Sequence, residues 1–156
     1  MREILFRGQT RKKGEKVSLG GTPVDSNWVY GGVAQFNEER AIIYQTEPEF
    51  HKFAVYAETL GQFTGLTDKK GKKIFEGDIV HAVYQVGYVG CKDIDYGIGI
   101  VKYCASYYGG ASYEIDIIGD SGSRIFTASL ENGVEVIGNV YDNPELLTQG
   151  DQLCFF

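Results

Sequence analysis

Residues 61–80 constrain the fold of this chain more than any other part of its sequence. They predict a strand, a glycine turn, a short strand, a second turn and another strand. The first turn is Asp68-Lys69-Lys70-Gly71-Lys72, in which Gly71 can take a positive φ at no side-chain cost. The second is Glu76-Gly77-Asp78. Strands this short and turns this tight indicate a β structure.

The composition favours the same architecture over the whole chain. The 156 residues are enough for one domain, or for one domain with a smaller lobe. Hydrophobic residues make up 43% of the chain, so it can bury a core. The 21 glycines and only 3 prolines are typical of many short strands joined by glycine turns.

Short strands are predicted on both sides of the central segment. The earlier ones form an N-terminal β lobe over residues 1–58, with strands at 2–7, 28–34, 41–44 and 53–56. The later strands are expected at 78–86, 99–104, 113–118, 124–127 and 134–138, with an exposed glycine-rich loop at 87–96. A hairpin turn is predicted at 119–122. We therefore expect a mainly β protein.

The second domain is expected to span residues 59–156, unless the two parts form one compact domain. Within it, four or five short strands predict a small SH3-like barrel over about residues 59–141. A short C-terminal helical turn is predicted at residues 142–147, with Pro144 at its first helical position.

Charge is distributed unevenly along the chain. The net charge is −6, but residues 1–16 hold six Lys or Arg against two Glu, and residues 69–73 hold four Lys and no acid. General nucleic-acid binders usually carry a broad basic face. Two small basic spots on an acidic chain do not have that pattern.

Membrane insertion and secretion are not predicted. No apolar run approaches the roughly 18 residues that a membrane span needs, and the first residues read as a strand instead of a signal peptide. The three cysteines, Cys91, Cys104 and Cys154, are odd in number and widely spaced, as is typical of reduced thiols. We expect a cytoplasmic location and no contact with a membrane.

Three blocks of sequence resemble the YopX family, which is found mainly in phages and prophages. The first is Arg2-Glu3-Ile4-Leu5-Phe6-Arg7-Gly8 with Trp28-Val29-Tyr30-Gly31, and the second runs from Thr59-Leu60-Gly61-Gln62-Phe63-Thr64-Gly65-Leu66 to Gly77-Asp78-Ile79-Val80. The third is Val136-Ile137-Gly138-Asn139-Val140-Tyr141 followed by Asp142-Asn143-Pro144-Glu145-Leu146. The resemblance implies a mostly β chain encoded by a phage or prophage. It supplies no catalytic residues, and turn geometry alone is enough to explain the central block.

No arrangement of residues predicts an enzyme, a metal site or a cofactor. Gly119-Asp120-Ser121-Gly122 is similar to a serine-protease nucleophile segment, but neither His51 nor His81 stands in a protease context, and a hairpin turn explains it better. Asp93 and Asp95 have the spacing of the first ligands of a calcium loop, but the later ligands of such a loop are missing. Glu114 and Asp116 share a strand face that is expected to be solvated.

Binding to a protein is the leading functional expectation. Tyr is a frequent interface anchor, and the candidate contact residues are Tyr88, Tyr96, Tyr107 and Tyr108. The expected partner is an unidentified host or phage protein, or a second copy of the chain, with a non-enzymatic accessory role in the host cytoplasm.

The alternative is a nucleic-acid-binding barrel that uses the two basic turns at 11–16 and 69–73. Its phosphate-contacting residues would be Arg11, Lys12, Lys13, Lys69, Lys70, Lys72 and Lys73. The same lysine-rich turn at 69–73 can instead serve to protect a strand edge.

Overall fold

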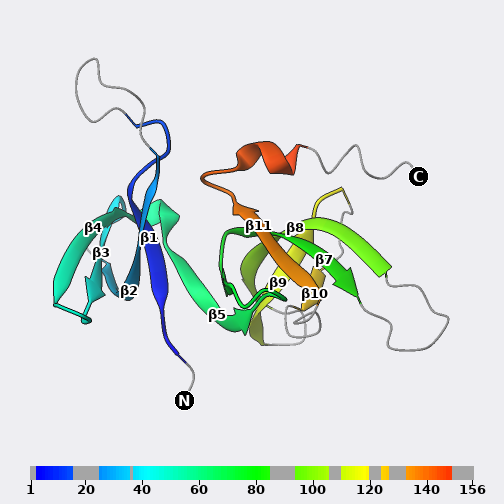
Figure 1. Cartoon of the computed structure of the whole chain (residues 1–156), viewed down its shortest axis with the longest axis horizontal. Helices are drawn as coiled ribbons and strands as arrows, with labels where there is room; N and C mark the ends of the chain where they lie inside the picture. The colour runs from blue at the N-terminus through cyan, green and yellow to red at the C-terminus, as the bar shows by residue number, and fades with distance from the viewer. Residues whose placement is uncertain are drawn as a thin grey trace. The chain divides into compact units, whose positions relative to one another are not determined.

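The computed structural model describes residues 3–15, 25–35, 37–84, 94–105, 110–119, 124–126 and 133–148. Within these ranges the chain is mainly β, with two antiparallel sheets, two 3-10 turns and no α-helix, which confirms the mainly β prediction (Figure 1). The chain divides into two compact units, Met1–Phe63 and Thr64–Phe156. The division falls inside strand β5 (Gly61–Thr67).

The first unit is built on a strongly curved antiparallel sheet. Its strands are β1 (Phe6–Arg11), β2 (Asn27–Gln35), β3 (Arg40–Gln45) and β4 (His51–Tyr56), followed by the 3-10 turn η1 (Ala57–Thr59). The sheet order is β4-β3-β2-β1-β5-β6, where β6 is Lys73–Phe75. Residues alternate between the two faces of a strand, and a small core forms on one face from Val29, Ala41, Ile43 and Val55.

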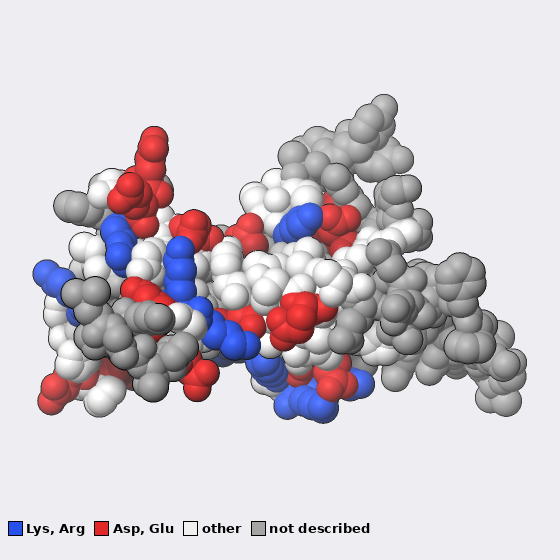
Figure 2. Space-filling model, turned by 90° about the horizontal axis from the view of Figure 1, so that it is seen from above, with Lys and Arg blue, Asp and Glu red and all other residues white. Residues whose placement is uncertain are grey.

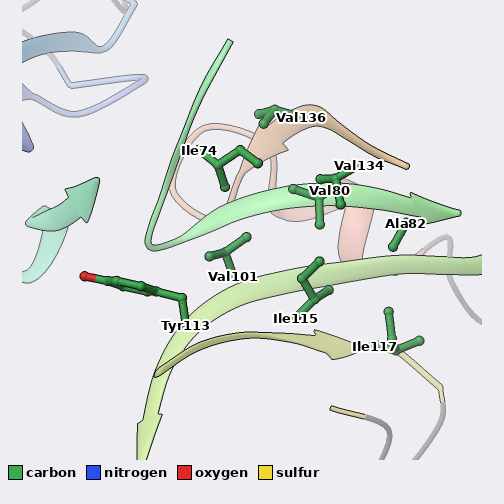
Figure 3. Packing of buried hydrophobic residues seen from close by; sticks show 9 residues of the cluster. All are labelled: Ile74, Val80, Ala82, Val101, Tyr113, Ile115, Ile117, Val134 and Val136. Carbon is green, nitrogen blue, oxygen red and sulfur yellow. The ribbon is translucent and has the colours of Figure 1, made fainter. Parts of the chain in front are cut away.

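The second unit is organised around a five-stranded antiparallel sheet with the order β10-β9-β8-β7-β11. Its strands are β7 (Asp78–Tyr84), β8 (Ile94–Ala105), β9 (Ala111–Ile117), β10 (Arg124–Phe126) and β11 (Val134–Asn139). Figure 3 shows their apolar side chains converging on one cluster, which Ile74 of β6 joins. The cluster contains Ile74, Val80, Ala82, Val101, Tyr113, Ile115, Ile117, Val134 and Val136.

The expected SH3-like barrel does not close in the part of the chain that the structure describes. The sheet stays open because β10 pairs with β9 at one edge and β11 pairs with β7 at the other. Ile74 on β6 and the partly buried Leu66 on β5 pack against the core cluster, although both strands belong to the first sheet.

Several strand boundaries also differ from the prediction. The first strand is Phe6–Arg11 instead of 2–7, because its pairing with β2 begins at Phe6 and extends to Arg11. Strand β8 begins at Ile94, so the end of the predicted loop at 87–96 belongs to a strand, while residues 87–93 lie outside the described residues. The predicted C-terminal helical turn is confirmed as the 3-10 turn η3 (Pro144–Leu147), with Pro144 in its first turn.

Candidate functional site

Asp68 is the structural centre of the lysine-rich turn. The residue is buried, with 5% of its surface exposed. Its Oδ1 accepts hydrogen bonds from the backbone N–H groups of Lys70 at 2.8 Å and Lys72 at 2.9 Å, and its Oδ2 accepts one from Val136 N–H on β11 at 3.1 Å. Burial raises the pKa of Asp68, but these three donors and the nearby Lys72 charge outweigh that effect and lower the pKa below its usual value.

The turn covers the outer edge of strand β11. The N–H of Lys69 donates to the Val134 carbonyl at 3.1 Å, beside the Val136 bond to Asp68. The ammonium groups of Lys69 and Lys70 both contact the Glu135 carboxylate at 2.5 Å. Hydrogen bonds from Lys69 and then Lys70 lower the pKa of Glu135 to about 2. Because an open strand edge is a template for unwanted pairing, these contacts protect β11.

Other polar residues of the same segment also bind backbone groups. The Thr64 hydroxyl donates to the Ile74 carbonyl at 2.9 Å, and Asp78 Oδ2 accepts from Phe75 N–H at 2.8 Å. Gly71 and Gly77 both have φ of +81°, as the two turns require. The characteristic segment at 61–80 is therefore explained by the turns and strand contacts that it makes.

The N-terminal basic turn is likewise tied to neighbouring residues of the first unit. Lys12 forms an ion pair with Glu58, and its ammonium lies 4.4 Å from the centre of the Tyr56 ring. The hydrogen bond with Glu58 raises the pKa of Lys12. Glu15 accepts bonds from Lys12 N–H at 3.0 Å and from the Tyr56 hydroxyl at 3.1 Å, and these two bonds lower its pKa.

The remaining basic candidates lie on the surface around these contacts. Arg11, Lys13 and Lys72 are exposed, and Lys73 is half-buried at the start of β6. On the face seen in Figure 2, Lys and Arg side chains are interspersed with Asp and Glu. The two basic turns belong to different units, and their proposed contact with phosphates stays a prediction.

Of the four tyrosines predicted as protein contacts, one lies within the described residues. Tyr96 is half-buried and packs against the core cluster of the second unit. Tyr88, Tyr107 and Tyr108 lie outside the described residues, so their role stays a prediction.

No group of three or more His, Cys, Asp or Glu side chains in the described ranges is arranged to hold a metal ion. Asp116 forms an ion pair with Lys102 at 2.5 Å, and Glu114 is buried instead of solvated, at 4% exposure.

His51 is exposed and lies 3.9 Å from Glu49, while Cys104 is a free, half-buried thiol. Asp93, Asp120 and Ser121 lie outside the described residues, as does the side chain of Asp95.

An apolar surface that the sequence reasoning missed covers the solvent side of β2, β3 and β4. We call it the outer face. Cross-strand pairing aligns Gly32 with Tyr44 and Ala34 with Ile42, and Ile42 in turn pairs with Ala54. Phe50, in the turn before β4, is 60% exposed and stacks on Tyr44 with the ring centres 6.0 Å apart. The outer face thus consists of Tyr30, Gly32, Ala34, Ile42, Tyr44, Phe50 and Ala54.

Two cations accompany the outer face, and both lie near aromatic rings. The Lys52 ammonium is 5.6 Å from the centre of the Phe50 ring, and the Arg40 guanidinium is 3.9 Å from that of Tyr56. Cations in such positions are attracted by the negative face of the ring. Near Tyr56 a polar cleft of about 300 Å³ is lined by Lys12, Glu38, Glu39, Arg40, Tyr56 and Glu58.

The outer face could have been found from residues 28–34. In Trp28-Val29-Tyr30-Gly31-Gly32-Val33-Ala34, both alternating sets of residues lack charge. When such a strand packs against a core on one side of its sheet, its other uncharged face stays exposed and is available for contacts.

Comparison with known proteins identifies the family. No curated protein matches the chain. Separately, no helix of the described residues is long and apolar enough to cross a membrane. The crystal structure of protein EF1440 from Enterococcus faecalis is similar over 94% of this chain and 99% of that one, at 17% identity and a TM-score of 0.45. The YopX protein family matches residues 24–148. The chain therefore belongs to the YopX family.

Proposed function

We propose that this YopX protein is a non-enzymatic accessory protein of a phage or prophage that acts by binding a protein. The partner is a host or phage protein, or a second copy of the chain, encountered in the cytoplasm of the host cell. The outer face of β2, β3 and β4 is the contact surface.

The observation that carries this proposal is the exposure of the outer face. Tyr30 is 42% exposed and Phe50 is 60% exposed, and Gly32, Ala34 and Ala54 of the outer face are exposed as well. Aromatic residues give a large contact area at low entropic cost and are enriched in interfaces. A contiguous apolar patch on a surface otherwise rich in charge is a frequent mark of a binding site.

The contacts of the lysine-rich turn favour this function over nucleic-acid binding. Lys69 and Lys70 are engaged by Glu135, and Lys12 is engaged by Glu58. A phosphate group would have to displace these carboxylates before it could use the three ammonium groups. The energy of nucleic-acid binding comes largely from such phosphate contacts.

Affinity capture from host lysate tests the proposal. The tagged chain is compared with a Phe50→Ser variant and with a Tyr103→Ser variant, which removes a ring of similar exposure, 55%, from strand β8. We expect a discrete protein to be retained by the wild-type chain and by Tyr103→Ser, to survive nuclease, and to be lost with Phe50→Ser.

Retention that depends on nucleic acid would contradict the proposal. Retention that vanishes with nuclease, falls steeply with salt, and is lost when Lys69, Lys70, Lys72 and Lys73 become Ala would support nucleic-acid binding and contradict the proposal.

A further inference from the structure

We draw no further inference here: the strongest candidate, the exposed apolar outer face of β2, β3 and β4, belongs to the proposed function already described, and nothing in the structure shows what covers it.

Discussion

Replacing Asp68 with Ala should destabilise the second unit more than any other single change in the lysine-rich turn. The substitution removes the acceptor of three backbone N–H groups, those of Lys70, Lys72 and Val136. It also releases the outer edge of β11, which the turn covers.

The size of the effect follows from the surroundings of the three donors. Val136 is buried, so its N–H loses its partner at a cost of about 1–3 kcal/mol. Lys70 and Lys72 are exposed, so water replaces the carboxylate there and each lost bond costs about 1 kcal/mol or less. Relief of the buried charge returns part of this cost. We expect a net loss of about 2–4 kcal/mol in the free energy of unfolding, a large fraction of the total stability of a domain.

Urea denaturation followed by circular dichroism measures this loss. The matched control is Glu135→Gln, which removes the ion pairs of Lys69 and Lys70 but leaves the backbone hydrogen bonds to Asp68 in place. We expect a clearly smaller loss for the control. If Asp68→Ala unfolds within about 0.5 kcal/mol of the wild-type chain, the structural role assigned to this carboxylate is wrong.

Two further predictions concern the same turn and the outer face. The pKa of Glu135 falls from 4.5 in the unfolded chain to about 2 on folding, and the pKa of Asp68 also falls. Both carboxylates therefore stabilise the fold above pH 4.5 and lose that effect as the pH falls toward 2. The free energy of unfolding should be lower at pH 3 than at pH 6, and Asp68→Ala or Glu135→Gln should each make that difference smaller. Gly71→Ala, at a φ of +81°, should cost about 1–2 kcal/mol of stability through backbone strain alone, since nothing lies within 4 Å of the added Cβ. Gly32→Ala, with the same open surroundings but no positive φ, should be neutral or slightly stabilising, and equal losses for the two variants would refute the argument.

Local chemistry made the two turns at 68–78 predictable from sequence. Gly71 and Gly77 were expected to occupy turns, and both take positive φ. Asp68 begins the first turn, and its bonds to the backbone of Lys70 and Lys72 are the local contacts that Asp commonly makes in turns. Its bond to Val136 was not foreseen, because that partner is 68 residues away in the sequence. Protection of a strand edge was an alternative for the lysines, and β11 supplies the edge.

Long-range pairing limited the prediction of the architecture and of the site. The expected barrel depends on which strands pair at the sheet edges, and the alternation of residues within a strand does not determine its partners. The same limit applies to the outer face. Ile42 and Tyr44 were recognised as strand residues, but their alignment with Gly32, Ala34 and Ala54 is a property of the assembled sheet.

The most direct test of the central claim is whether the outer face carries the interactions of this protein. Capture from nuclease-treated lysate, with the wild-type chain, Phe50→Ser and Tyr103→Ser side by side, measures this in one experiment. We predict that a retained protein is lost only with Phe50→Ser. Equal retention by all three chains would show that the outer face is not the contact surface and would contradict the account.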